Sequence, residues 1–256
     1  MSVTRADEPL TYGSYLRIPE LLDLQTPLAE PSVHDEMLFI LGQQAQELWF
    51  KQILHDLHLV IADLERGALL DAVRLLRRAI QILAVLSGES EVLETIPLRE
   101  FHGFRGYLRA ASGLQSTQFR ELEIASGLRD EAYLRMVGKL LDLPAVLDRW
   151  PVSLHDGLVK ALDSVAPDPT RALMALYRDP DEWPQLYLLA EALSDYELRF
   201  QAWRFHHVQL VERIIGDQAP GTGGSPGSTY LSRTLGYRFF PELWEARNRL
   251  TERGAS

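Results

Sequence analysis

Apolar residues recur at helical spacing over long stretches of this chain, and this pattern restricts its fold more than any other feature. From Met37 to Leu64 they keep to one face of a helix with about 3.6 residues per turn, which predicts an amphipathic helix over 35–67. The same spacing predicts long helices over 71–87 and 181–215, and shorter ones over 98–108, 115–125, 131–141 and 145–165. Strand-like alternation is confined to scraps such as TYL and YRFF. The sequence therefore predicts an all-α fold, a helical bundle.

The length of 256 residues predicts one domain covering 1–256, because a single core stops growing near this size. Residues 1–31 are punctuated by four prolines, yet they carry many aromatic and apolar side chains, among them Tyr12, Tyr15 and Leu16. A disordered tail seldom carries so many. We expect this N-terminal arm to dock on its own domain or on a neighbouring subunit.

The charge balance restricts the partners of the chain. A formal net charge of −10 and an isoelectric point near 5.2 argue against a surface for nucleic acid, which needs clustered Lys and Arg. No apolar run approaches the roughly 18 residues of a membrane span, and the N-terminus lacks a signal-peptide core. We expect a cytoplasmic protein that handles small molecules, with no nucleic-acid or membrane partner.

The chain contains no cysteine. Disulfides, thiolate nucleophiles, sulfur-based metal cages and covalent c-type haem attachment are therefore excluded. Any bound iron or haem has to rely on histidine, tyrosine, methionine or carboxylate ligands.

One histidine stands on an apolar helix face that ends in a glycine-rich loop, 216–228. His207 shares its face with Trp203, Leu210 and Ile214, whereas His206 is rotated about 100° away. The pattern suits a nitrogen ligand in an apolar wall, but taken alone it is more typical of a core histidine satisfied by a hydrogen bond. The loop lacks the lysine and the preceding strand of a phosphate-binding loop, which favours a lid or a turn.

A second polar position is Arg105, which lies among aromatic and apolar residues in FHGFRGYLRAASG, 101–113. A guanidinium in such surroundings needs an anion, and its planar fork suits a carboxylate. The alternative is a structural ion pair with one of the many acidic residues of the chain.

Several blocks of sequence occur in the order found in tryptophan 2,3-dioxygenases. They are LTYGSYLRIPELL (10–22), HDEMLFI (34–40), QELWFKQIL (46–54), GFR (103–105), SGLQS (112–116), FQAWRFHHVQLVERIIG (200–216), GTGGSPG (221–227) and FFPELW (239–244). The chain thus resembles this family at both ends. The resemblance is weaker over 117–195, where the chain also looks shorter than the family's usual central segment.

The resemblance implies a non-covalent haem b with molecular oxygen as co-substrate. His207 would be the iron ligand, and Trp203, Ser112 and Phe101 would lie against the cofactor. The bundle would surround the haem, and four intertwined copies would form a homotetramer.

The resemblance also implies that the substrate is L-tryptophan or a substituted indole amino acid. Arg105 would bind its carboxylate and Thr222 its ammonium group. The remaining implied contacts are Phe39, Phe104 and Gln43 around the indole, with Tyr12, Tyr15 and Leu16 supplied by a neighbouring subunit.

Two positions depart from the family pattern. The distal histidine of the family is Gln43 here, and a tyrosine two residues before GFR is Phe101. The Gln43 amide can accept the indole N–H or donate to dioxygen, but it cannot take up a proton near neutral pH. We expect dioxygenation of the indole C2=C3 bond to an N-formylkynurenine-type product. The alternatives are transfer of one oxygen atom, giving an oxindole or hydroxypyrroloindole, and a non-catalytic haem-binding sensor.

Overall fold

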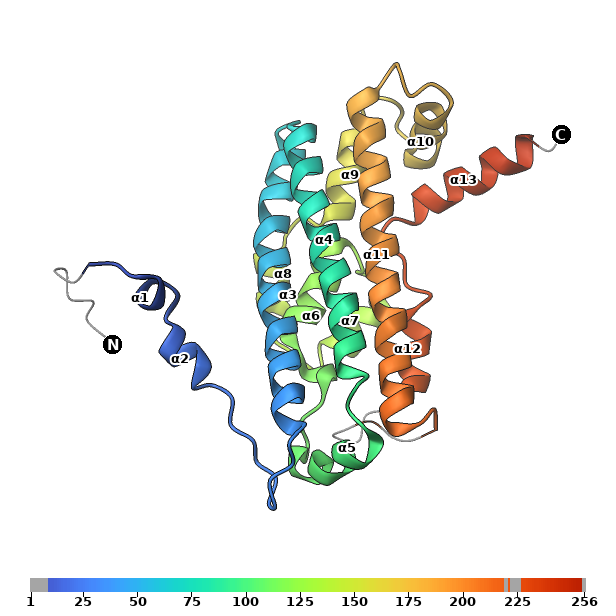
Figure 1. The fold of residues 1–256 in the computed structure, drawn as a ribbon. Helices are drawn as coiled ribbons and strands as arrows, with labels where there is room; N and C mark the ends of the chain where they lie inside the picture. Colours follow the sequence, from blue (N-terminus) through green and yellow to red (C-terminus); the bar gives the residue numbers. More distant parts are fainter. Residues whose placement is uncertain (1–8, 219–220, 222–226, 255–256) are drawn as a thin grey trace.

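The computed structural model describes residues 9–218, 221 and 227–254, and these residues contain helices and no strand. Three long helices form the body: α3 (Glu36–Glu65), α4 (Leu69–Leu93) and α11 (Pro184–Ile215). They run side by side along the length of the molecule, and α4 packs against both of the others (Figure 1). The predicted all-α class is confirmed.

The long helices extend close to their predicted bounds, with one clear difference at the end of α4. The predicted helix stops at Ser87, whereas α4 continues to Leu93, whose side chain is buried. Its partner across the interface is Gly42 of α3, where an added Cβ would lie 2.7 Å from a Leu93 methyl carbon. The absence of a side chain at Gly42 lets the two helices approach closely.

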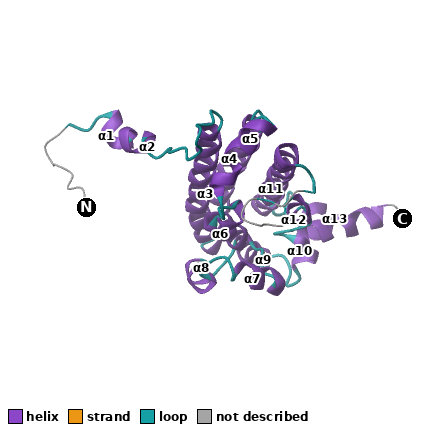
Figure 2. Ribbon diagram, turned by 90° about the horizontal axis from the view of Figure 1, so that it is seen from below, coloured by secondary structure: helices purple, strands orange, loops and turns teal. Residues whose placement is uncertain are grey.

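Shorter helices fill one side of the body and its ends (Figures 1 and 2). They are α5 (Leu98–Arg105), η1 (Gly106–Leu108), η2 (Gly113–Gln115), α6 (Thr117–Ser126), α7 (Glu131–Val137), α8 (Leu143–Arg149), α9 (Leu154–Leu162), α10 (Pro169–Arg178), α12 (Ser228–Thr234) and α13 (Pro241–Gly254).

The single helix predicted over 145–165 is wrong. The chain breaks at Trp150 and Pro151 and restarts at Ser153, whose hydroxyl accepts the backbone N–H of Asp156 as an N-cap. Proline lacks the N–H that a continuing helix needs, and a serine cap begins the next one. The helices α10, α12 and α13 are not among the predicted ones.

The N-terminal arm stands away from the bundle (Figures 1 and 2). It contains α1 (Tyr12–Leu16) and α2 (Ile18–Leu22), which contact each other. Tyr12 is 78% exposed and Tyr15 is 70% exposed. In the structure the arm therefore does not dock on its own domain, which was one of the two expected places.

The base of the arm is nevertheless fixed to α3. The buried carboxylate of Glu36 accepts the backbone N–H groups of Leu28 and Ala29 at 2.8 and 2.9 Å. Closer to α2, the side chain of Gln44 donates to the backbone carbonyl of Leu24. These contacts set the point at which the arm leaves the body.

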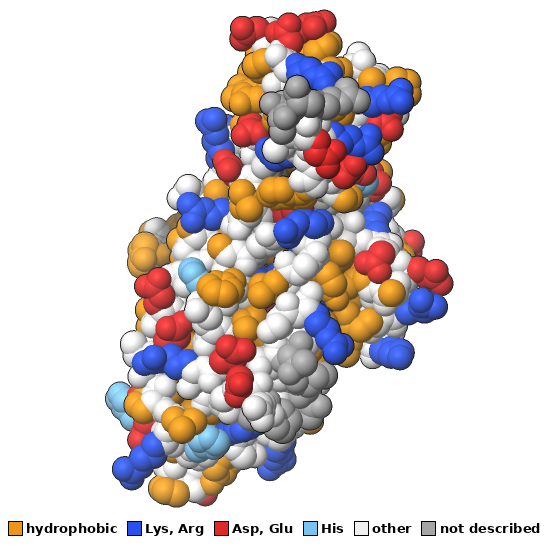
Figure 3. All heavy atoms as spheres, turned by 90° about the vertical axis from the view of Figure 1, so that its right-hand side faces the viewer, with side chains coloured by type: hydrophobic (Ala, Val, Ile, Leu, Met, Phe, Trp, Pro, Cys, Tyr) orange, Lys and Arg blue, Asp and Glu red, His pale blue; other side chains and the backbone are white. Residues whose placement is uncertain are grey.

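The described part of the chain has no helix that is both long and apolar enough to cross a membrane. On the face drawn in Figure 3, basic and acidic side chains are interspersed among hydrophobic ones.

Candidate functional site

A cavity opens between α3, the α5–α6 region and the C-terminal half of α11. Its volume is about 200 Å³. Its lining is mainly apolar and comes from segments far apart in the sequence. It includes six of the residues predicted for the site: Phe39, Gln43, Phe101, Ser112, Trp203 and His207.

The imidazole of His207 lies in this wall and stacks on Trp203, with ring centroids 5.5 Å apart. Its Nδ1 is buried and has no hydrogen-bond partner, so a core histidine satisfied through this atom is not what the structure contains. Burial, together with the nearby positive charge of Arg120, lowers the pKa of His207 to about 4. The ring is therefore neutral near pH 7 and has a nitrogen lone pair available for a metal.

His206 is a useful contrast because it adjoins His207 on the same helix. Its Nδ1 is also buried without a hydrogen-bond partner, but His206 is not among the described residues that line the cavity. In the structure His207, and not His206, is turned towards the cavity.

Phe39 and Gln43 lie one turn apart on α3 and line the same cavity as His207. The ring of Phe39 rests against Phe101 and Phe104, with centroid distances of 5.9 and 5.4 Å. Phe104 is fully buried behind these two rings and is absent from the described lining. Phe104 thus packs directly against two rings of the described lining, and its own contact with an indole stays a prediction.

Arg105 is the last residue of α5, one turn after the cavity-lining Phe101. Its side chain is partly buried and is not part of the described lining of the cavity. Residues four apart share a helix face, so Arg105 and Phe101 are neighbours on α5.

Thr222 lies outside the described residues. The glycines near the two ends of its loop, Gly221 and Gly227, both line the cavity. Two described residues of the loop predicted as a lid or a turn, 216–228, thus belong to the cavity wall.

Tyr12, Tyr15 and Leu16 belong to α1, which stands away from the body of its own chain (Figure 1). None of the three lines the cavity of the protomer that carries them.

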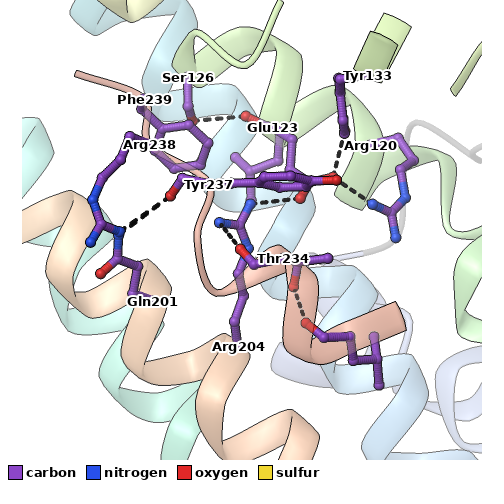
Figure 4. Close-up of polar contacts among 12 residues, drawn as sticks. Arg120, Glu123, Ser126, Tyr133, Gln201, Arg204, Thr234, Tyr237, Arg238 and Phe239 are labelled. Atoms are coloured by element: carbon purple, nitrogen blue, oxygen red, sulfur yellow. Dashed lines mark hydrogen bonds and ion pairs between the residues drawn. The ribbon is translucent and has the colours of Figure 1, made fainter. Parts of the chain in front are cut away.

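The sequence did not predict the buried charged group beside the cavity. Arg120 of α6 and Arg204 of α11 both line it, and both bind the fully buried carboxylate of Glu123 at 2.6 Å (Figure 4). The hydroxyl of Tyr133 donates to the same carboxylate at 2.5 Å. Burial raises the pKa of Tyr133 well above 10, so its hydroxyl stays neutral.

A signal for this group is present in the sequence. Arg120 and Glu123 are spaced i, i+3 on α6, with Phe119, Leu122 and Ile124 beside them, and Arg204 stands between Trp203 and Phe205 on α11. Their meeting is invisible in one dimension because 81 residues separate Glu123 from Arg204.

A family model described as tryptophan 2,3-dioxygenase matches residues 1–142 and 158–250. Among curated proteins, the tryptophan 2,3-dioxygenase of Herpetosiphon aurantiacus is 39% identical over 94% of this chain and 98% of its own length. That of Anaeromyxobacter sp. (strain K) is 41% identical over 94% and 96%, and that of Caulobacter vibrioides is 37% identical over 95% and 99%.

The matches cover nearly all of each of the three relatives. The alignment with the Herpetosiphon protein has 260 positions but covers only 94% of the 256 residues of this chain, so the relative has residues for which this chain has no counterpart. That they fall in the middle of the chain stays a prediction of the sequence. The family model also extends through most of 117–195 and omits only 143–157 there. With a family model over most of its length and full-length relatives at 37–41% identity, the chain belongs to the tryptophan 2,3-dioxygenase family.

Proposed function

We propose that this chain is a haem-dependent tryptophan 2,3-dioxygenase. It inserts both atoms of dioxygen at the indole C2=C3 bond of L-tryptophan, or of a close derivative, and releases an N-formylkynurenine-type product. One observation carries the proposal: a neutral imidazole, His207, lines a cavity with its Nδ1 unpartnered, in a chain that matches the family along nearly its whole length.

The residues of the cavity fit a non-covalent haem b. His207 would bind the iron, and Trp203, Phe101 and Ser112 would lie along the macrocycle. The absence of cysteine suits non-covalent binding. When bound, the haem supplies the redox-active iron that activates dioxygen. A neutral imidazole in a mainly apolar lining is what such a group requires of a protein.

The substrate would meet residues of α3 and α5. Phe39 offers an aromatic wall, and the amide of Gln43 can accept the indole N–H through its oxygen. No proton is transferred to Gln43, because an amide is not basic near neutral pH. Arg105 would bind the carboxylate from its position beside Phe101, and Thr222 would bind the ammonium group.

The arm completes the proposed site in an assembly of four chains. Tyr12, Tyr15 and Leu16 are exposed on α1 and would enter the cavity of a neighbouring subunit, where their apolar surface would be buried. The homotetramer and the cytoplasmic location remain predictions of the sequence.

Haem titration tests the cofactor assignment. The protein is titrated with haem b while the Soret band is recorded, for the wild type, His207→Ala and the neighbouring His206→Ala. We expect saturable binding in the wild type and His206→Ala, and loss of the histidine-ligated spectrum in His207→Ala. Equal spectra for the two variants would refute the role of His207.

Isotopic oxygen tests the reaction. The reduced, haem-loaded protein is incubated with tryptophan and ¹⁸O₂, and the product is identified by mass spectrometry. Two labelled atoms on a ring-opened product are expected. One labelled atom on an intact ring would replace dioxygenation by transfer of a single oxygen, and the absence of tryptophan-dependent oxygen uptake would indicate a sensor.

A further inference from the structure

Two arginines line the cavity with almost no exposure to solvent. The side chain of Arg120 is 4% exposed and that of Arg204 is 3% exposed. Among the described residues, both form their ion pairs with one carboxylate, that of Glu123. Glu123 itself is not in the described lining of the cavity, and the carboxylate that is, that of Glu47, accepts a hydrogen bond from Gln118 at 2.7 Å. Around Glu123, two positive charges therefore face one negative charge in a buried place.

The unpartnered polar atoms of the cavity wall are of one chemical kind. Within the described part of the chain, the buried lining atoms that lack a partner are all nitrogens, and no lining oxygen is among them. Besides His207 Nδ1, all are N–H donors. They are Gln46 Nε2, Arg120 Nε, Trp203 Nε1 and Arg204 Nε. A buried donor without an acceptor costs folding free energy, so a ligand that brings acceptors to these side chains would stabilise the protein.

The position of Arg204 connects these donors to the ligand of His207. The two residues are three apart on α11, and both line the cavity. Side chains at this spacing are neighbours on a helix surface. A ligand bound through the His207 imidazole therefore lies beside a guanidinium, whose planar fork suits a carboxylate.

We propose that Arg120 and Arg204 form a carboxylate-binding site for the ligand of this cavity, with Glu123 as the residue that positions both guanidiniums. The inference rests on the proposed function, which supplies two ligands with carboxylates: haem b with its propionates, and the amino-acid substrate, whose carboxylate would then bind here and not at Arg105. Glu123 holds Arg120 through Oε2 and Arg204 through Oε1, so each guanidinium is fixed while its Nε remains free of a protein partner.

Arg120→Met tests this role because it removes one guanidinium and leaves the positive charge of Arg204 paired with the negative charge of Glu123. Arg149→Met is the matched control: Arg149 also binds a carboxylate of α6, that of Glu121 at 2.8 Å, but it is not part of the described cavity lining. Circular dichroism verifies the fold of both variants. Arg120→Lys serves as a second variant that retains the charge and loses the planar fork.

The first measurement is the dissociation constant of haem b, compared with that of haem b dimethyl ester, whose propionates are esterified. If a propionate occupies the site, Arg120→Met weakens haem b at least about tenfold and leaves the ester within about twofold. Arg120→Lys weakens haem b to a smaller extent, and Arg149→Met changes neither ligand.

The second measurement is the affinity of the haem-loaded ferric protein for tryptophan and for tryptamine, which lacks the carboxylate. If the substrate occupies the site, Arg120→Met weakens tryptophan at least about tenfold, leaves tryptamine unchanged and leaves haem affinity intact.

The inference is overturned if Arg120→Met changes none of these affinities, or if it weakens haem and its ester equally, as a purely structural ion pair would. A wild-type protein that binds neither haem nor tryptophan would overturn the proposed function as well. Normal wild-type binding with no selective effect of Arg120→Met would overturn this inference alone.

Discussion

Replacing Glu123 by glutamine should destabilise the folded protein strongly. The change preserves the shape of the side chain and removes the charge that balances two guanidiniums, those of Arg120 and Arg204. Glu123 is fully buried, so solvent cannot take over its role. Breaking a buried ion pair in this way costs about 3–5 kcal/mol. The hydrogen bond from Tyr133 does not offset the loss, because it is neutral and loses its charged acceptor.

Glu121→Gln is the matched comparison on the same helix. Its partner Arg149 is about half exposed, so this pair should contribute at most about 1 kcal/mol. Urea unfolding of the haem-free proteins, followed by circular dichroism, gives both free energies of unfolding. At roughly 2–4 °C per kcal/mol for a chain of this size, Glu123→Gln should also lower Tm by about 6–20 °C. If the two variants lost the same free energy of unfolding to within about 1 kcal/mol, the charge of Glu123 would not be needed to stabilise the buried guanidiniums of Arg120 and Arg204.

Three further outcomes are expected. Gln43→His should make the catalytic rate depend on pH near 6.5, because imidazole titrates there and an amide does not. An unchanged rate and substrate preference would show that residue 43 does not influence the reaction. The His155–Glu242 contact at 3.0 Å raises the pKa of His155 above 6.5 and lowers that of Glu242 below 4.5. Its stabilisation should therefore be full between these values and disappear as pH rises through the folded pKa of His155 or falls through that of Glu242. The urea midpoint of the wild type should accordingly exceed that of His155→Ala by more at about pH 5.5 than at about pH 8.5. An equal difference at the two pH values would contradict this. Gly157→Ala should lose about 1–3 kcal/mol in urea unfolding, because the new Cβ would lie 2.7 Å from a Leu64 methyl carbon, and wild-type stability would show that α9 shifts freely.

The sequence predicts the long helices well because their apolar faces are continuous. It fails where tertiary packing decides: α4 continues past Ser87 because Leu93 finds a place opposite Gly42. It also fails for α13, whose composition is too polar for an apolar stripe to stand out, although Leu243 and Ala246 of this helix are buried.

For the site, the motifs bring Phe39, Gln43 and His207 to one cavity, as expected. The exact depth of each ring is not encoded in a motif, so the burial of Phe104 behind its neighbours is apparent only in three dimensions. The cluster around Glu123 depends on the meeting of α6 with α11, which one-dimensional spacing does not reveal.

That meeting also dictates an order of events during synthesis. Arg204 donates to Glu123 on one side and to the backbone carbonyl of Thr234 on the other, so the cluster is complete only when residue 234 has left the ribosome. Until then, the emerging chain displays the faces of α3 and α4, including the face of α4 that α11 later covers. Thr234 also lines the cavity, so the described wall of the haem site is closed only after nearly the whole chain has been synthesised.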